Sequence, residues 1–494
     1  MSINKTSPPL PNRISKGTPI STRRALLSNS LKLSAGLVLP PATFGFADAE
    51  PLVDMRPGAG EPAHVPAGFI GLGYEMSSVA SPGLLSTANH RYVRLIRGLG
   101  REGVLRVGGI VANYTRYEPN GTVASDRENT VITRASLEQF AAFLTKIGWK
   151  AIWSVNFAQG SVYDAVEEAR AVAAILGTRL LALEIGNEIE NYGRGAKPFR
   201  HAPYDYETYR SEYDQWHAAI VKAVPGIHFA APDTASSVEW VERMAKDARG
   251  DVQLLTTHYY RSGQRNGSAQ QLLDPDPRLK DVLTRMRASS QSSGIPWRMC
   301  ETNSFSGGGL PGVSDTFIGA LWTLDYILLL AQYGCSGVNI ETGVNQLGFV
   351  SSYSPIQDDG HGINSAGVPY YAMLAFAGAM NGCDQCLPVD IDAHGLNLTA
   401  YLLGTAGKPR SAVLVNRDRS QDAPLAFGEL GLGTVSALRM LAPSPESKTG
   451  VTFAGASVDS SGEWKAREVE HIHNGRVTVP RMSAVVLRSA GSPI

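Results

Sequence analysis

The chain has 494 residues, of which 43% are hydrophobic and 18% charged, so it can build a large core and is not a disordered protein. Its 45 lysine and arginine residues balance 45 aspartate and glutamate residues. A neutral chain has no long-range field that gathers nucleic acid, polyanions or anionic membrane, so we expect none of these as partners. Four cysteines are too few for a disulfide framework.

Residues 1–49 predict an export signal of the twin-arginine type. Arg23 and Arg24 precede a short apolar run, Leu31 to Leu39, and Ala47-Asp48-Ala49 supplies the small residues of a cleavage site. The apolar run is shorter than the roughly 20 residues that cross a bilayer. The alternative is a frayed basic tail with a fortuitous apolar patch. With the signal, the mature chain begins near Glu50 and works in the periplasm or outside the cell.

Between residues 66 and 380, short apolar runs alternate with longer amphipathic segments. Near-continuous apolar runs are typical of parallel strands buried on both faces. Eight strand-then-helix units predict an α/β fold, the (β/α)8 barrel. The strands are expected at Gly68–Glu75, Val104–Gly109, Lys150–Asn156, Leu180–Glu188, Ile227–Asp233, Val252–Tyr260, Trp297–Asn303 and Gly337–Gly343. Helices are expected at Ser136–Ile147, Val162–Leu176, Tyr206–Val224, Leu279–Ser290, Asp315–Tyr333 and Tyr370–Met380.

The pattern changes in residues 381–494, which predict an antiparallel β-sandwich. Short strands are expected at Leu396–Leu403, Ser411–Val415, Ser436–Leu441, Val469–His473 and Arg476–Val479. Asn474-Gly475 is a two-residue hairpin signal and predicts that the last two strands pair with each other. Residues 50–65 are expected to add an edge strand to this sandwich.

Candidate catalytic residues lie at the carboxyl ends of the predicted strands, where such barrels carry their chemistry. The fourth strand ends at Asn187-Glu188, the sixth at His258-Tyr259-Tyr260, and Glu301 lies near the end of the seventh. Two carboxylates on opposite walls suit cleavage of a glycosidic bond, one as proton donor and the other facing the anomeric carbon. Asn187 is expected to hold the sugar 2-hydroxyl, and a tyrosine hydroxyl to keep Glu301 ionised. For either glutamate alone, the structural alternative is a helix cap or a rim salt bridge.

Five segments together carry a resemblance to a known family. They are Gly71-Leu72-Gly73-Tyr74-Glu75, Arg106-Val107-Gly108-Gly109, Glu184-Ile185-Gly186-Asn187-Glu188, His258-Tyr259-Tyr260 and the run from Glu301 to Gly309. The chain resembles the heparanase and β-glucuronidase family, glycoside hydrolase family 79, over essentially its whole mature length. The resemblance implies Glu188 as acid/base, Glu301 as nucleophile and Tyr259 as the hydrogen-bond partner of Glu301.

The resemblance also implies a set of substrate-binding residues. They are Glu75, Asn113, Asn303, Ser306, Gly307, Gly308, Glu341 and Asn345. Family members bind the glucuronate carboxylate with backbone N–H groups of the loop after the nucleophile, which Gly307 and Gly308 retain. Ser306 and Asn345 stand where tyrosines are expected, Asn113 replaces an aspartate, and Glu341 would place a negative charge near the substrate.

These residues predict a retaining exo-β-glycosidase, β-glucuronidase-like and working without cofactor or metal. Because of the replaced tyrosines, a neutral sugar (a glucoside, a xyloside or a disaccharide glycoside) is the alternative substrate. A catalytically inactive, carbohydrate-binding barrel is the alternative of another class. The sequence does not determine the oligomeric state.

The cysteines are expected to have no catalytic role. Cys383 and Cys386 form a C-x-x-C pair, but only His394 is nearby as a further ligand, so the pair predicts a local disulfide or two inert thiols. Cys300 precedes Glu301, and the alternation of side chains along a strand predicts that it points away from the cavity as a buried small hydrophobe.

Overall fold

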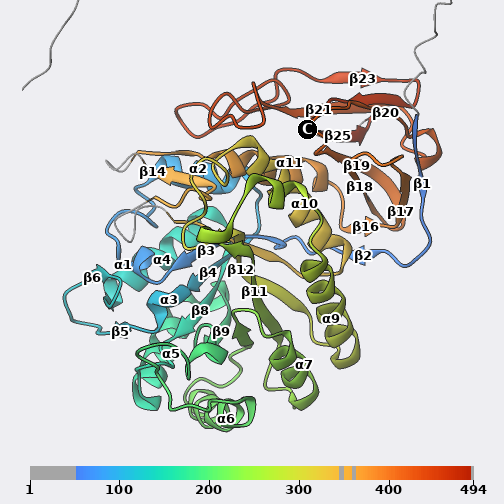
Figure 1. The fold of residues 1–494 in the computed structure, drawn as a ribbon. Helices are drawn as coiled ribbons and strands as arrows, with labels where there is room; N and C mark the ends of the chain where they lie inside the picture. The colour runs from blue at the N-terminus through green and yellow to red at the C-terminus, as the bar shows by residue number, and fades with distance from the viewer. Residues whose placement is uncertain (1–51, 344–349, 359–362, 491–494) are drawn as a thin grey trace, which may run out of the picture. The chain divides into compact units, whose positions relative to one another are not determined.

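The computed structural model describes residues 52–343, 350–358 and 363–490, and its centre is a closed barrel of eight parallel strands (Figure 1). In order around the barrel these are β3 (Ile70–Glu75), β4 (Val104–Gly108), β8 (Lys150–Val155), β9 (Leu180–Ile185), β10 (Phe229–Thr234), β11 (Leu254–Gly263), β12 (Trp297–Ser306) and β13 (Val338–Glu341). β13 closes the barrel against β3, with Glu341 opposite Gly73. The predicted (β/α)8 barrel is confirmed.

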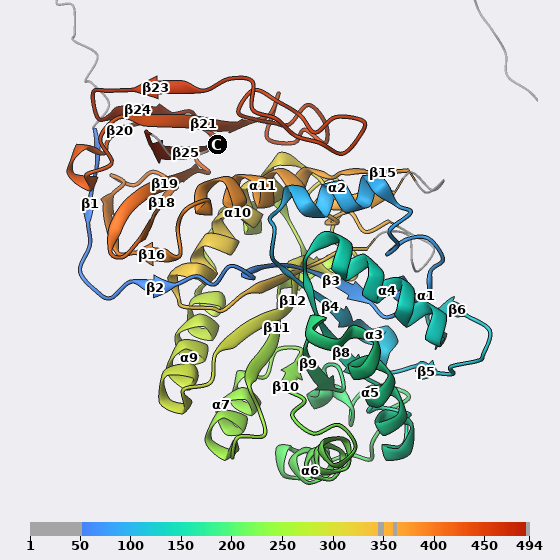
Figure 2. The same ribbon diagram turned by 180° about the vertical axis from the view of Figure 1, so that it is seen from behind.

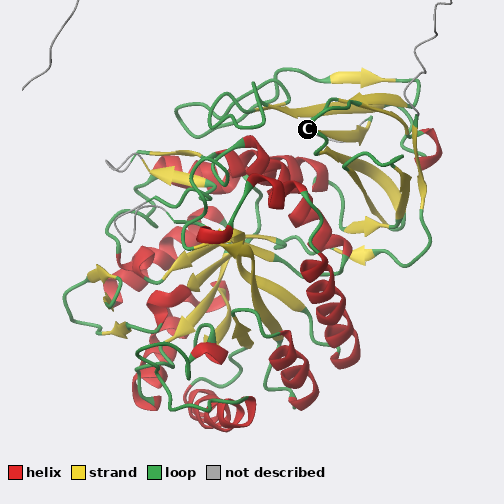
Figure 3. Ribbon diagram, in the orientation of Figure 1, coloured by secondary structure: helices red, strands yellow, loops and turns green. Residues whose placement is uncertain are grey.

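Helices surround the barrel strands (Figure 3). The longer ones are α2 (His90–Gly98), α4 (Arg134–Ile147), α5 (Val162–Leu176), α6 (Tyr206–Ala223), α7 (Val238–Asp247), α9 (Pro277–Ser293), α10 (Phe317–Gln332) and α11 (Val368–Met380). Capping boxes at Thr133 and Ser161 begin α4 and α5, and left-handed glycines 148 and 294 end α4 and α9. Short helices are α1 (Ser77–Ala80), α3 (Gly109–Ala112) and α8 (Ala269–Leu273).

Two small sheets lie outside the barrel strands. After β4 the chain forms a three-stranded sheet of β5 (Thr115–Tyr117), β6 (Ala124–Asp126) and β7 (Asn129–Ile132). Before α11, β14 (Ile356–Asp358) pairs with β15 (Asn364–Ala366). The described residues contain no helix that is both long and apolar enough to cross a membrane. Residues 1–49 and Asn345, for which the sequence predicts an export signal and a substrate contact, lie outside the described residues.

The C-terminal region consists of two β-sheets. One contains β17 (Val389–Asp392), β1 (Val53–Pro57), β20 (Ala423–Ala426) and β24 (Arg476–Val479). The other contains β2 (Ala63–His64), β16 (Gln385–Leu387), β18 (Leu398–Thr405), β19 (Lys408–Asn416), β25 (Ser483–Ser489), β21 (Val435–Leu441) and β22 (Thr452–Phe453), with β23 (Glu470–Ile472) beside β21. Every pairing is antiparallel except that of β1 with β20. Figure 2 shows β1 alongside the sandwich strands, so residues near the start of the described chain share a sheet with residues near its end.

The prediction of a hairpin at Asn474-Gly475 is wrong. β23 pairs with β21 and β24 pairs with β20, so the turn carries the chain from one sheet to the other. Gly475 has the positive φ that the dipeptide favours, at 66°. Burial decides the pairing instead, because Val477 and Val479 enter the apolar layer between the sheets.

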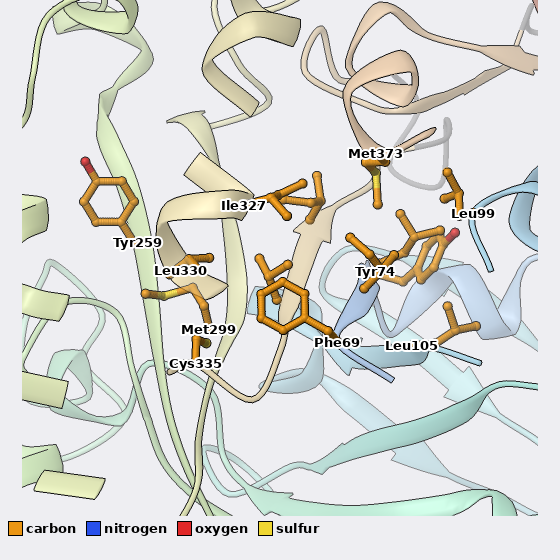
Figure 4. Packing of buried hydrophobic residues seen from close by; sticks show 14 of the residues in the cluster. Phe69, Tyr74, Leu99, Leu105, Tyr259, Met299, Ile327, Leu330, Cys335 and Met373 are labelled. Carbon is orange, nitrogen blue, oxygen red and sulfur yellow. The ribbon is translucent and has the colours of Figure 1, made fainter. Parts of the chain in front are cut away.

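A single hydrophobic cluster joins the barrel to the inner sheet of the sandwich. Phe69, before β3, stacks on Phe376 of α11 with ring centroids 5.3 Å apart, and the cluster continues to Leu438 in β21. Figure 4 shows part of it, with Phe69, Ile327 of α10 and Met373 of α11 gathered between strands and helices. α10 is buried almost all round because β12 contacts one side and β18 and β19 contact another.

Candidate active site

Arg106 lies at the centre of a buried network at the carboxyl end of the barrel. It projects from β4 and is fully buried. Its guanidinium donates to Glu184 Oε2 at 2.9 Å, Glu301 Oε2 at 2.9 Å, Asn187 Oδ1 at 2.8 Å and Asp233 Oδ2 at 2.5 Å. Burial opposes its charge, but the three carboxylates more than offset this and raise the pKa of Arg106. Arg106 on β4 therefore fixes side chains from β9, β10 and β12 relative to one another.

Glu301 is a buried carboxylate that receives hydrogen bonds on both oxygens. Arg106 donates to Oε2, and the hydroxyl of Tyr260 donates to Oε1 at 2.8 Å. Charge-assisted hydrogen bonds to a carboxylate favour its ionised form. The two donors thus fix the direction of the Glu301 carboxylate, as a nucleophile requires.

Glu188 occupies a left-handed turn just after β9 ends at Ile185. Its φ and ψ are 52° and 47°, and its N–H donates to Asp233 O at 2.9 Å. This conformation is uncommon for a residue other than glycine and is worth noting at a candidate site, although His394 and Ala406 of the sandwich also adopt a positive φ. Its side chain is 29% exposed and lies 3.4 Å from His258 Nδ1. One oxygen of Glu188 and one of Glu301 lie within 4.8 Å of each other, so the structure brings the two predicted glutamates together.

His258 links the two glutamates to a buried aspartate. Its Nε2 lies 3.0 Å from Asp233 Oδ1, and its Nδ1 lies 3.8 Å from Glu301 Oε2. Burial disfavours the imidazolium, but Asp233 and Glu301 outweigh it, so the pKa of His258 is raised well above its ordinary value. Carboxylates therefore face both ring nitrogens, an arrangement that favours the imidazolium.

The hydrogen-bond partner of Glu301 is Tyr260, and the prediction of Tyr259 is wrong. Side chains alternate along β11, so His258 and Tyr260 face the barrel interior while Tyr259 faces outward. The hydroxyl of Tyr259 donates to Asp276, and its ring stacks on Tyr326 of α10 with centroids 5.5 Å apart.

The prediction that Cys300 points away from the cavity is also wrong. The pairing of β11 with β12 shifts by one residue, because Thr257 faces Met299 whereas His258 faces Glu301. Cys300 is therefore the extra residue of a β-bulge, where the simple alternation of sides fails. Its sulfur lies within 4.8 Å of a carboxylate oxygen of Glu184 and of Asp233, below Glu301. The expectation that it is buried is confirmed.

Asn187 and Asn113 meet in the wall beside Glu188. Asn187 Oδ1 accepts from Arg106, and its N–H lies 3.4 Å from the Tyr192 hydroxyl. That hydroxyl donates to Asn113 Oδ1 at 2.7 Å. Both amides are buried at 1% exposure. Both predicted residues therefore lie in the wall of the site beside Glu188.

Glu75 and Glu341 end the adjacent strands β3 and β13 and lie close to Glu301. Burial and the charge of Glu301 raise the pKa of Glu75 to about 8 and that of Glu341 well above its ordinary value. Glu75 accepts from the N–H of Val111 at 2.9 Å. Glu341 Oε2 is buried without a hydrogen-bond partner among the described residues. Burial and the neighbouring carboxylates thus favour the neutral form of both carboxyls, and the negative charge expected at Glu341 stays a prediction.

Asn303 and the loop after it shape the wall between β12 and β13. Asn303 Nδ2 donates to the carbonyls of Glu341 and Tyr353, and its Oδ1 accepts from Ser304 N–H. The structure thus gives Asn303 backbone partners on both sides, and its predicted contact with the sugar stays a prediction. Ser306 ends β12, and Gly307 and Gly308 follow with φ of 84° and 93°, a backbone that favours glycine.

Three residues of this network, Arg106, Asp233 and Glu184, have no role assigned from the sequence, because their signals are indirect. Asp233 ends the fifth predicted strand, and catalytic residues of such barrels lie at the carboxyl ends of strands. No sequence motif marks Asp233 as catalytic, however. It has a positive φ of 59° and is 1% exposed. Glu184 lies inside its strand, where burial raises its pKa to about 7, with a further rise from Asp233.

Among the described residues, two groups of side chains have spacing suitable for a cation, Glu188 with His258 and Glu301, and Glu184 with Asp233 and Cys300. Arg106 donates to Glu301 in the first group and to Glu184 and Asp233 in the second. A guanidinium thus already neutralises part of the negative charge of both groups.

The two cysteines of the C-x-x-C pair are free thiols. Cys383 is partly buried and Cys386 is buried. Burial raises the pKa of Cys383 to about 11 and that of Cys386 to about 12, so both resist forming thiolates. Of the two predicted alternatives, the structure has the inert thiols.

No protein-family model matches the chain. It is 24% identical over 417 residues to a beta-glucuronidase of Aspergillus niger, covering 72% of this chain and 76% of that protein. It is 26% identical over 325 residues to a beta-glucuronidase of Neurospora crassa, covering 56% of each chain. A 4-O-α-L-rhamnosyl-β-D-glucuronidase from Fusarium oxysporum has a similar structure, with a TM-score of 0.72, 17% identity, and coverage of 88% of this chain and 100% of that chain.

A family 51 α-L-arabinofuranosidase from Bifidobacterium longum also has a similar structure. The TM-score is 0.64 at 14% identity, covering 89% of this chain and 99% of that one. At such identities the solved structures show a shared fold. Together, the sequence relatives and the fold support a glycoside hydrolase.

Proposed function

We propose that this chain is an exported, retaining exo-β-glycosidase of glycoside hydrolase family 79 that hydrolyses β-glucuronides. The observation that carries the proposal is the pair Glu188 and Glu301, whose oxygens approach within 4.8 Å. Retaining glycosidases hold their two carboxyl groups about 5–5.5 Å apart, whereas inverting enzymes need about 6.5–9.5 Å to admit a water molecule. The short separation supports double displacement.

In the first step Glu301 attacks the anomeric carbon while Glu188 protonates the departing glycosidic oxygen. The bond from the anomeric carbon to that oxygen breaks, and an ester bond to Glu301 forms. In the second step Glu188, now a carboxylate, takes a proton from water, which attacks the anomeric carbon and releases Glu301. Arg106 and Tyr260 each donate to a different oxygen of Glu301 and so fix its carboxylate, and His258 Nδ1 lies 3.4 Å from Glu188 Oε1.

A glucuronide is the first candidate substrate because the similar proteins are named beta-glucuronidases. The raised pKa values of Glu75 and Glu341 support this choice. Charged carboxylates at these positions would repel the carboxylate of an acidic sugar, and a raised pKa weakens that repulsion because it favours the neutral carboxyl. Gly307 and Gly308 retain the backbone expected to face the sugar carboxylate.

Covalent labelling tests the mechanism. An activated 2-deoxy-2-fluoro-β-glucuronide is expected to inactivate the enzyme and to leave the sugar on Glu301, which peptide mass spectrometry locates. Proton NMR of the first product is expected to show the β-anomer. Labelling of another residue, or release of the α-anomer, would exclude this mechanism. Loss of turnover in Glu301→Ala would exclude the inactive sugar-binding barrel.

A neutral β-glycoside is the second candidate, favoured by Ser306 standing where a carboxylate-binding tyrosine is expected. Side-by-side hydrolysis of p-nitrophenyl β-glucuronide, β-glucoside and β-xyloside at pH 5 and pH 8 separates the candidates. For a glucuronidase, we expect kcat/KM for the glucuronide to fall toward pH 8, as Glu75 ionises, more steeply than for the neutral sugars. A glucoside preference at both pH values would assign the neutral substrate.

A further inference from the structure

The mouth of the barrel opposite Glu188 and Glu301 holds a cavity of about 550 Å³ that the proposed reaction does not use. It is lined by the amino ends of the strands, where Gly68 precedes β3, Val104 begins β4 and Lys150 begins β8. A cavity of this volume is within the range that holds small organic ligands, about 300–1,000 Å³. It is separated from the catalytic glutamates by the length of the strands.

The floor of the cavity is apolar and built from small side chains. Val104, Ala182 and Leu254 line it, and Ala230 and Cys300 belong to the same small apolar cluster. Barrel interiors are ordinarily filled by layers of bulky branched residues. Two alanines and a cysteine in this layer leave room that a ligand with an apolar body would fill.

Arg298 places a buried cation in the cavity wall. It is 2% exposed, and its Nε donates to Asn339 Oδ1 at 2.6 Å, while its terminal nitrogens donate to backbone carbonyls. A Cβ atom on Gly337 would lie 1.8 Å from Nη1, and one on Gly71 2.6 Å from Nη2, so two glycines make room for the guanidinium. Burial lowers the pKa of Arg298, and no carboxylate of the described residues pairs with it. Its charge has no counter-ion.

The rim of the cavity adds positive charge. Lys150 and Arg179 line it, whereas Glu102 is the one acidic side chain among the described lining residues. Arg179 donates to the carbonyl of Gly148 at 2.8 Å, and neither Arg179 nor Lys150 forms an ion pair within the described part of the chain. This end of the barrel is cationic in a chain whose total charge is zero.

We propose that this cavity binds a small carboxylate with an apolar body, in the size range of a medium-chain fatty acid. The carboxylate lies at the rim formed by Lys150 and Arg179, in the field of Arg298, and the apolar body covers Ala182 and Leu254. Opposite charge favours the anion over neutral or cationic ligands of the same shape. Burial of the apolar body against Ala182 and Leu254 adds to the affinity because it removes apolar surface from water.

Binding of octanoate to the full chain tests the proposal, with octan-1-ol and octylammonium as ligands of the same length. Calorimetry is expected to show octanoate binding about tenfold or more tightly than the other two, and octanoate is expected to raise the melting temperature. Equal binding of octan-1-ol would overturn the anionic assignment. Absence of octanoate binding would overturn the site, whatever the outcome for glycosidase activity.

Variants locate the binding. Reversing the two rim charges, Lys150→Glu with Arg179→Glu, is expected to weaken octanoate binding about tenfold or more. Ala182→Phe fills the cavity and is expected to abolish it. The matched control reverses two exposed sandwich cations, Lys465→Glu with Arg467→Glu, and is expected to leave binding unchanged. If the rim variant binds octanoate as tightly as the wild type, octanoate does not bind at this rim and the proposed site is overturned. This outcome stands even if Ala182→Phe fails to fold.

Discussion

At the scale of single residues, two adjacent tyrosines of β11 have separate roles. Tyr260 donates to Glu301, whereas Tyr259 donates to Asp276 outside the barrel. We expect Tyr260→Phe to lower kcat about 10- to 100-fold, because a charge-assisted hydrogen bond to the nucleophile is lost. Tyr259→Phe is the matched control and is expected to keep kcat within about twofold. Similar losses in both variants would contradict this division.

Glu168 makes the stability of the fold depend on pH. It is buried in α5, where burial raises its pKa to about 7 despite a hydrogen bond from Trp153. The unfolded carboxyl ionises near its ordinary value, so the folded state binds more protons between these two pKa values, and stability falls as pH rises through that window. Glu168→Gln is expected to stabilise the protein by about 3 kcal/mol at pH 8 and to change little at pH 4.

Urea unfolding at the two pH values measures this effect. The neighbouring Glu167 is partly exposed and paired with Arg170, so Glu167→Gln serves as the control and is expected to change stability by less than about 1 kcal/mol. An equal effect of Glu168→Gln at both pH values would show that protonation is not the cause.

At the scale of elements, strand order and strand ends could be predicted from the sequence, but side-chain direction could not. All eight barrel strands appear where apolar runs predict them, and Glu188 and Glu301 meet as strand ends should. The bulge at Cys300 shifts the pairing by one residue, and no local pattern marks it. In the sandwich, the central strand β25 has no strong turn signal before it and was missed. Pairing there depends on contacts between residues far apart in the chain.

Gly73 in β3 and Gly109 just after β4 leave space for the carboxyl groups of Glu341 and Glu75. A Cβ on Gly73 would lie 2.4 Å from Glu341 Oε2, and one on Gly109 would lie 2.1 Å from Glu75 Oε2. We expect Gly73→Ala to displace the Glu341 carboxyl and to lower kcat/KM about tenfold or more. Gly428→Ala, where the added atom meets nothing within 4 Å, is the control. Wild-type kcat/KM in Gly73→Ala, with the fold intact by circular dichroism, would mean that Glu341 does not shape the site.

At the scale of the whole molecule, Asp325 of α10 joins the barrel helices to the inner sheet. It pairs with Arg417 at 3.0 Å and accepts from Thr399 and from Tyr401, all from sandwich strands or the residue after them. Asp325→Ala leaves a buried guanidinium without its partner, which costs about 3–5 kcal/mol. Guanidinium-induced unfolding is expected to show this loss, against less than about 1 kcal/mol for Asp281→Ala, which breaks an exposed pair with Arg285.

The pairing of β1 with strands near the other end of the chain has a consequence for synthesis. Met55 lies opposite Ile391, and Val53 opposite Leu425, so β1 has no sheet to join until those segments exist. Domains ordinarily fold as they leave the ribosome, the amino-terminal part first. Here the strands of the barrel are complete in the chain before the partners of β1 are made. β1 therefore stays unpaired until most of the chain has been translated. In a nascent chain arrested before residue 389, β1 is exposed without a partner strand.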